Sequence, residues 1–148
     1  MAKFRFRLAT LQRLRESHRD EMRSKLAEAY AAERTLEDQV LAIHAEEEDL
    51  REIHKRCLET SSPDVNRLLD VQRYSASLKG RLSTLKSQNQ VLATEIEKRR
   101  QALVEADQQV RVLEKLHDRQ MATHRDQERT AEAKSLDEIA SLRRKDEI

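Results

Sequence analysis

The sequence predicts an all-α protein: two long helices packed as an antiparallel coiled-coil hairpin with a C-terminal helical overhang. Turn-forming residues are the first reason, because Gly and Pro occur once each in 148 residues, where average usage would place about 18. Sheets and doubly wound folds need many turns, which two such residues cannot supply. Composition is the second reason, with 39% charged and 3% aromatic residues. A seven-residue apolar repeat is the third.

The second half of the chain carries the clearest repeat. Two rows of residues, offset by three positions, each recur every seven positions from Leu68 and from Val71, which is the a/d pattern of a coiled-coil seam. The rows are Leu68, Ser75, Leu82, Asn89, Ile96, Leu103 and Val110, and Val71, Leu78, Leu85, Leu92, Arg99, Ala106 and Leu113. The polar members Ser75, Asn89 and Arg99 are of the kind that fixes register at some cost in stability. A disordered polar chain has no reason to keep such a period, so we expect a helix over about 64–142.

The first half repeats the same step less regularly and predicts a helix from about Phe4 to Leu58. Its row comprises Leu8, Arg15, Met22, Ala29, Leu36, Ile43, Leu50 and Cys57. A turn is expected over about 59–63, with Ser62 as the N-cap of the second helix and Pro63 at its first position. Pairing about this turn places residue i roughly opposite residue 123 − i.

One domain over 1–148 is expected from the length. Residues from about Gln120 onward extend past the start of the first helix. Their apolar side chains are sparse, and a lone helix with so little to bury is marginal in water. We therefore expect this overhang to fray or to fold against a partner.

Composition argues against an enzyme, a cofactor site or a metal site. Phosphate-binding loops need several glycines, and the chain has only Gly80. His117 and His124 share a helical row, but seven residues separate them by about 10 Å along the axis, too far for one metal ion. The acidic run Glu46–Asp49 spreads around a helix and does not converge as a catalytic carboxylate pair does. We expect no catalytic residues.

The remaining composition predicts a soluble, cytosolic protein with at most peripheral membrane association. Cys57 is the only cysteine, which fits a reducing compartment. No apolar run approaches the roughly 20 residues of a membrane span, and the basic N-terminus is not followed by the apolar core of a signal peptide. A net charge of +1 with so few aromatics argues against nucleic-acid binding.

Several apolar residues fall off the seam rows near the open end of the predicted hairpin. They are Phe6, Leu14, Val104, Val112 and Leu116. Such a cluster indicates an interface, while the alternative interpretation is a slightly broad hydrophobic stripe. The same end carries five cations and no acid within residues 1–15. A segment of this kind is suited to an acidic protein pore or an anionic membrane.

Three segments resemble the flagellar export protein FliJ family. The opening run Lys3–Arg15, KFRFRLATLQRLR, resembles the first residues of that family. Val112–Gln120, VLEKLHDRQ, resembles its later basic and apolar segment, and Ala133–Ala140, AKSLDEIA, resembles a stretch near its end. Chain length and the expected two-helix hairpin also match, so the resemblance covers essentially the whole chain.

The resemblance implies a non-enzymatic component of the flagellar type III protein export apparatus, similar in shape to the gamma subunit of rotary ATPases. The open end would enter the central pore of the export ATPase hexamer and promote its assembly and activity. Contacts with the export gate in the inner membrane and escort of empty export chaperones are also implied, at the cytoplasmic face of that membrane. Candidate ring contacts are Arg5, Phe6, Arg7, Arg13, Leu14, Val112 and Leu116. Leu41 and Tyr74, nearer the turn, are candidate gate contacts.

Other functions also fit the sequence. A generic self-associating structural coiled coil would form larger bundles and gain helix as its concentration rises. A membrane-surface module acting through the basic N-terminus would bind anionic vesicles, and salt would abolish that binding. The equivalent stalk of an injectisome type III secretion system is an alternative within the export class.

Overall fold

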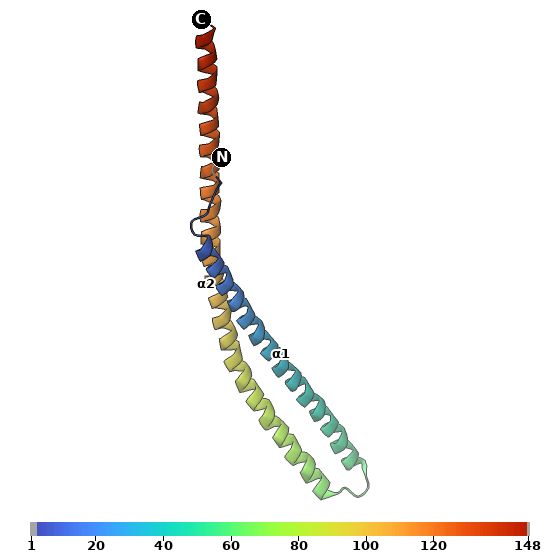
Figure 1. The fold of residues 1–148 in the computed structure, drawn as a ribbon. Coiled ribbons are helices and arrows are strands. Elements are labelled where there is room, and N and C mark those ends of the chain that lie inside the picture. Colours follow the sequence, from blue (N-terminus) through green and yellow to red (C-terminus); the bar gives the residue numbers. More distant parts are fainter. Residues whose placement is uncertain (1–2, 148) are drawn as a thin grey trace. The chain divides into compact units, whose positions relative to one another are not determined.

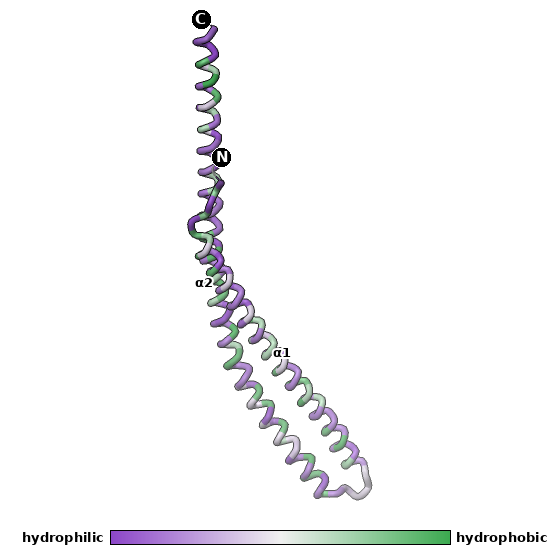
Figure 2. The backbone as a smooth tube through the Cα atoms, viewed as in Figure 1, coloured by the Kyte–Doolittle hydropathy of each residue, from purple (hydrophilic) through white to green (hydrophobic). Residues whose placement is uncertain are grey.

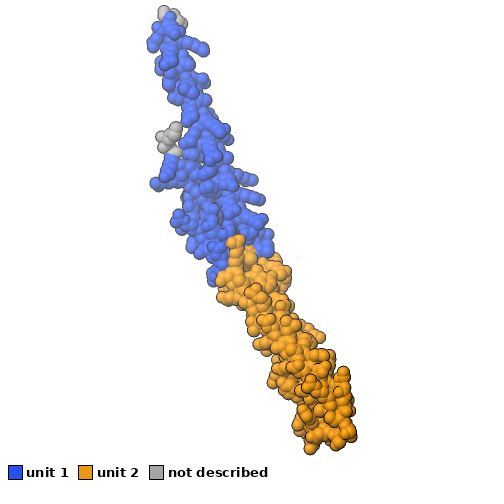
Figure 3. Space-filling view, turned by 90° about the vertical axis from the view of Figure 1, so that its right-hand side faces the viewer, with its two compact units in different colours: residues 1–21, 104–148 blue, residues 22–103 orange. Residues whose placement is uncertain are grey.

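The computed structural model describes residues 3–147 and contains two helices, as the sequence predicts. Helix α1 spans Ala9–Glu59 and helix α2 spans Val65–Asp146, and they pack antiparallel (Figure 1). The all-α hairpin is thereby confirmed. Its helices contribute to two compact units, which are described separately below (Figure 3). Unit 1 comprises Met1–Glu21 and Val104–Ile148, and unit 2 comprises Met22–Leu103. The single domain over 1–148 stays a prediction.

Unit 2 is held by apolar side chains from the predicted rows. Ile43, Leu78 and Leu85 form a buried cluster, with Leu78 at 0% exposure. The partly buried side chains packed against this cluster are Leu36, Val40, Leu50 and Leu82. No polar side chain is buried within the described residues. Burial of apolar surface, at about 25 cal/mol per Å², therefore supplies the main favourable term for this unit.

Arg99, a polar member of the seam rows, makes hydrogen bonds both within α2 and across to α1. Its Nη1 donates to the backbone oxygen of Lys25 at 2.5 Å, and its Nε donates to Glu95 Oε1 at 3.0 Å. The neighbouring Arg100 donates from Nη2 to the hydroxyl of Tyr30 at 2.8 Å. Both arginines thus reach from α2 to α1, and a shift in register would break both contacts.

Asn89 does not occupy the seam, contrary to its row position. Its side chain is exposed, whereas Ile96, the next member of the same row, is buried. An α-helix turns once per 3.6 residues, so a strict seven-residue row rotates gradually out of the contact. A polar amide at the edge of the seam is more stable in water than facing apolar side chains.

The turn differs in detail from the prediction. Helix α1 ends at Glu59, after which Thr60 Oγ1 donates to the backbone oxygen of Cys57 at 2.9 Å. The N-cap of α2 is Asp64, not Ser62, because Asp64 Oδ1 accepts from the backbone N–H of Asn66 at 3.0 Å. Pro63 thus precedes the cap. A carboxylate at this position suits the positive end of the helix dipole, which favours Asp64 over Ser62 as the cap.

In unit 1, the expected helical start at Phe4 is wrong, because α1 begins at Ala9. The preceding residues Lys3–Leu8, here called the strap, are not helical. Half-buried and exposed side chains alternate along it: Phe4, Phe6 and Leu8 are half-buried, and Lys3, Arg5 and Arg7 are exposed. A period of two is that of an extended segment, and it competes with the helical period over these residues.

Unit 1 also contains the C-terminal part of α2, whose side chains become more exposed toward the end of the helix. Ala106, Val110 and Leu113 are buried, and His124 is still half-buried. From residue 129 to residue 147 every described side chain is exposed, and this segment is here called the arm. Hydrophilic residues dominate it (Figure 2). Helix α2 continues to Asp146, past the expected 142.

The arm starts later than the expected Gln120 because the strap is extended over residues 3–6. An extended residue advances about 3.3 Å against 1.5 Å in a helix, so the strap covers more of α2 than a helix of equal length. Within residues 3–147, neither helix has an apolar stretch of the length that a membrane span needs.

We expect Leu78→Ala to lower the free energy of unfolding by about 3 kcal/mol, because it opens a cavity in the fully buried centre of unit 2. Leu41→Ala is the matched control, since Leu41 is 67% exposed and its truncation should change stability by less than about 0.5 kcal/mol. Thermal unfolding followed by circular dichroism measures both. Equal melting temperatures for the two variants would show that the seam is assigned wrongly.

The alkaline titration of Tyr74 provides a second check. Its hydroxyl donates to Glu46 Oε2 at 2.9 Å, and this hydrogen bond, with smaller contributions from desolvation and the Glu46 charge, raises the pKa of Tyr74. The protonated phenol is favoured in the folded state, so its contribution is present at neutral pH and is lost as pH rises through the raised pKa.

In a Tyr30→Phe background only Tyr74 absorbs as tyrosinate, because the chain has two tyrosines. Adding Glu46→Gln should move the absorbance midpoint to lower pH. An unchanged midpoint would mean that the bond between α1 and α2 at this position does not form in solution.

Candidate docking surface of unit 1

In the first turns of α1 the apolar side chains are exposed, whereas several polar side chains are half-buried. Leu11 is 37% exposed and Leu14 is 63% exposed. The half-buried side chains of the same turns are Gln12, Glu16 and Arg19. Arg15, a member of the predicted seam row, is exposed. Leu11 and Leu14 are three residues apart and therefore share one outer face of the helix.

The facing part of α2 exposes apolar side chains at the same level. Arg15 Nη1 donates to Gln109 Oε1 at 2.9 Å, which agrees with the pairing expected from the sequence. Val112 lies one helical turn from Gln109 and is 64% exposed. Leu14 is adjacent to Arg15, so the two most exposed apolar candidates lie within a turn of the same cross-helix hydrogen bond.

The seven candidate ring contacts divide by exposure. Arg5, Arg7, Arg13, Leu14 and Val112 are exposed, whereas Phe6 and Leu116 are half-buried. The ring of Phe6 packs edge-on against His117, with centroids 5.0 Å apart and an interplanar angle of 85°. Phe6 therefore contacts α2 and is only partly available to a partner, unlike the cations on either side of it.

The exposed arginines are available for contacts with other molecules. Within the described part of the chain, no hydrogen bond or ion pair involves the side chains of Arg5, Arg7 or Arg13. Each guanidinium offers a planar set of donors that matches a carboxylate. Arg13 and Leu14 are adjacent in α1, and Leu14 and Val112 both lie near the Arg15–Gln109 hydrogen bond, so exposed apolar groups and exposed cations occur together in this part of unit 1.

The pairing of aromatic rings with histidines was missed from the sequence. Phe4 lies 5.6 Å from His117 and 5.5 Å from His124, measured between ring centroids. His117 Nδ1 is 3.3 Å from Asp118 Oδ1, and His124 Nε2 is 3.2 Å from Glu128 Oε1. The signal available in the sequence was the alternation Phe4-Arg5-Phe6, together with the seven-residue spacing of His117 and His124 in the second helix. Within residues 3–147, no group of three or more metal-ligating side chains comes together.

The two gate candidates lie in unit 2 but do not form one patch. Leu41 is 67% exposed and Tyr74 is 42% exposed. The Tyr74 hydroxyl is bonded to Glu46, five residues from Leu41 on α1. Five residues correspond to about 140° around a helix, so Leu41 and the Tyr74 hydroxyl meet different sides of α1.

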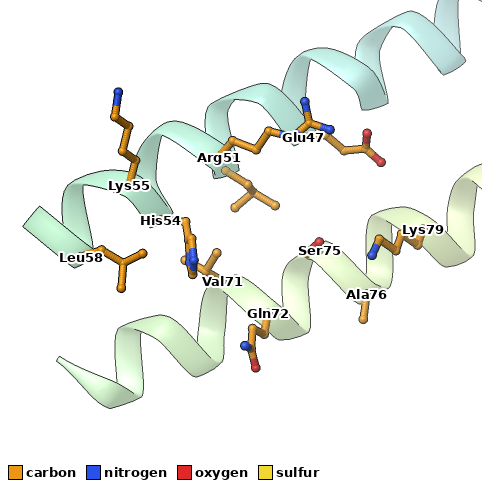
Figure 4. Close-up of a pocket in the computed structure, with 11 residues that line it drawn as sticks. Glu47, Arg51, His54, Lys55, Leu58, Val71, Gln72, Ser75, Ala76 and Lys79 are labelled. Carbon is orange, nitrogen blue, oxygen red and sulfur yellow. The ribbon is translucent and has the colours of Figure 1, made fainter. Parts of the chain in front are cut away.

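A groove lies between α1 and α2 near the turn of unit 2 (Figure 4). Ser75 and Ala76 on α2 are small and leave space there, and Leu50, Leu58 and Val71 supply its apolar lining. His54 points toward Val71, whereas Lys55 points away from the groove. The lining contains one imidazole, His54, and one carboxylate, Glu47. Its chemistry is that of an apolar contact surface with a charged rim.

Comparisons with known proteins bear on the whole chain. The family model described as "Flagellar FliJ protein" matches residues 4–146. No curated protein and no solved structure matched the chain. The family match covers nearly the full length and confirms the resemblance of the opening residues. This two-helix hairpin therefore belongs to the FliJ family and is a structural component of flagellar type III protein export.

Proposed function

We propose that this protein serves as a stalk for the flagellar export ATPase: the docking surface of unit 1 and the arm enter the central opening of the ATPase hexamer and promote its assembly and activity. The observation that carries the proposal is the exposure of Leu14 and Val112, at 63% and 64%, in the same unit as Arg5, Arg7 and Arg13, whose side chains make no hydrogen bond or ion pair within residues 3–147. An apolar surface rimmed by charge is typical of a protein interface.

The energetics favour a partner that encloses this end. Full burial of a Leu or Val side chain contributes roughly 1.5–3 kcal/mol, so Leu14 and Val112 alone would supply a substantial part of an interface. Exposed cations add less to affinity but accelerate encounter with an acidic surface. A ring with acidic groups at its opening would use both properties.

The arm supports the same proposal. Leu136, Ile139 and Leu142 are 67%, 49% and 61% exposed, respectively. A single helix that buries nothing is marginal in water, and it gains stability when a partner covers its apolar residues. A pore that surrounds the arm would cover these side chains whichever way they face.

Contacts with other export components extend the proposal. We infer that Leu41 and Tyr74 contact the export gate, that the protein works at the cytoplasmic face of the inner membrane, and that it escorts empty export chaperones. Leu41 is the stronger gate candidate, because its side chain is 67% exposed and lies outside the seam. The Tyr74 hydroxyl already bonds to Glu46, so its ring edge is the part left for a partner.

A self-associating coiled coil is the rival interpretation, and the exposed apolar residues of the arm favour it. Sedimentation over a wide concentration range separates the two. A self-associating chain forms larger species and gains helix as concentration rises, whereas a stalk stays small until the ATPase is added.

Reversing the charge of the candidate cations tests ring docking. The variant Arg5→Glu/Arg7→Glu/Arg13→Glu should keep the helix content of the parent, because the three side chains are exposed and unpaired. It should lose most of the saturable rise in ATP hydrolysis that the parent causes in a partly assembled export ATPase, since exposed charges steer docking.

The matched control is Arg34→Glu/Arg56→Glu/Arg73→Glu, which makes the same change in net charge on exposed residues of unit 2. Full stimulation by the unit 1 variant, or equal loss with the control, would contradict docking through this surface.

Truncating Leu41 tests the gate contact. Leu41→Ala should weaken binding to the cytoplasmic domain of the export gate by about fivefold, as expected for one exposed apolar contact. Val91→Ala serves as the control, since Val91 is 72% exposed on the other helix of unit 2. Titration by fluorescence anisotropy measures both. Equal affinities for the two variants would remove Leu41 from the contact.

A further inference from the structure

The strap is anchored to α2 by rings. Phe4 contacts both histidines, at 5.6 Å and 5.5 Å, and Phe6 contacts His117 at 5.0 Å. The Phe4–His117 and Phe6–His117 pairs meet edge-on, at 74° and 85°, which is a favoured arrangement for aromatic rings. Figure 1 shows the chain before α1 running beside α2. This cluster of Phe4, Phe6, His117 and His124 is here called the clasp.

The clasp determines where the strap cations point. Side chains alternate along an extended segment, so rings that contact α2 leave the intervening residues on the opposite side. Lys3, Arg5 and Arg7 are accordingly exposed. Successive cations on one side of an extended chain are about 7 Å apart. Lys3 and Arg5 follow this spacing, whereas Arg7 lies in the turn that Ala9 N closes on Phe6 O, so the strap presents three exposed positive charges, of which the first two lie on one side.

We propose that His117 and His124 are positioning residues for docking: through Phe4 and Phe6 they hold the strap so that its exposed cations Lys3, Arg5 and Arg7 bind a carboxylate-rich protein surface. This inference rests on the proposed function and adds residues that make no contact with the partner themselves. It also gives the two histidines a role other than metal binding.

Backbone hydrogen bonds hold only the end of the strap that joins α1. Within residues 3–147, the only backbone–backbone hydrogen bonds that involve the strap are the two at its junction with α1, from Ala9 N to Phe6 O and from Gln12 N to Leu8 O. Ordering a free segment costs conformational entropy for every residue. A clasp that orders the strap beforehand removes this cost from binding, and preorganisation of this kind raises affinity.

The chemistry of the strap favours a protein partner over a lipid surface. A membrane-binding segment inserts its aromatic and apolar side chains among the lipids while its cations meet the headgroups. Here the rings of Phe4 and Phe6 contact the histidines of α2. The outward side offers cations alone, and the guanidinium groups of Arg5 and Arg7 match carboxylates in geometry.

The first experiment tests the clasp without any partner. Trypsin should cleave after Lys3, Arg5 and Arg7 faster when the strap leaves α2, because a protease must surround the backbone that it cuts. His117→Ala/His124→Ala should speed this cleavage about tenfold, and Phe4→Ala, which leaves both helices untouched, should act in the same direction. His117→Phe/His124→Phe keeps the ring contacts and should restore slow cleavage. His44→Ala is the control, an exposed histidine of unit 2.

The second experiment measures the affinity of the same variants for the export ATPase at constant salt. The two alanine variants should bind roughly tenfold more weakly, the Phe variant should bind as the parent does, and the His44→Ala control should be unchanged. Rescue by Phe separates a positioning role from a need for the imidazole itself. Circular dichroism confirms equal helix content in every variant.

The outcomes distinguish the possible failures. Unchanged cleavage in both alanine variants overturns the clasp. Faster cleavage with unchanged affinity, while Arg5→Glu/Arg7→Glu still weakens binding, overturns the positioning role. If the arginine variant also binds normally, the proposed ring contact itself is wrong. Tighter binding of the alanine variants than of the parent to phosphatidylglycerol vesicles, with no change toward the ATPase, overturns the choice of a protein partner.

Discussion

The narrow apolar seam between α1 and α2 is the interaction on which every other feature depends. Among the described residues of this chain, 39% of which is charged, every buried side chain belongs to the seam rows. Ala29, Ile43, Leu78, Ile96 and Val110 are buried, and all five come from those rows. Within the described residues no polar side chain is buried, so the charged groups remain on the surface. We therefore expect specific contacts with other molecules to be made by exposed side chains and by the segments near the chain ends.

The unequal lengths of the helices decide where such contacts can form. Helix α2 has 82 residues and α1 has 51, so part of α2 has no helix opposite it. Within unit 1 the covering of α2 changes along its length. Val110 and Leu113 are buried, His117 and His124 are half-buried under the strap, and the arm is bare. The proposed docking surface lies where the covering changes, because apolar and charged groups are exposed together there.

The sequence predicts those parts of the structure that follow one period. Seam burial in unit 2 was predictable because a heptad places Ile43, Leu78 and Leu85 on one side of each helix. The strap was not, since Phe4 and Leu11 are also seven residues apart, and this heptad spacing competes with the period of two over the same residues. The spacing of apolar residues shows which of them share a face of the helix. It does not show which face packs against another segment.

Contacts between distant residues lay beyond sequence reasoning for a different reason. The pairing rule places Arg15 close to Gln109, but the reach of Arg99 to a backbone oxygen of Lys25 depends on rotamers and on local helix rotation. The clasp could not be predicted either, because the role of His117 and His124 depends on the strap packing against them. The family itself was recognisable from the opening residues KFRFRLATLQRLR, a motif that the structure divides between the strap and the first turns of α1.

The hydrogen bonds that join α1 to α2, here called ties, also limit how the length of such a chain can change. Arg99 fixes α2 against Lys25 in unit 2, and Arg15 fixes α1 against Gln109 in unit 1. An insertion in one helix between a tie and the turn would shift every later seam residue unless the other helix gained the same number. The arm is under no such restriction, because its side chains face water alone. Natural variation in length should therefore be paired within the hairpin and unpaired at its C-terminal end.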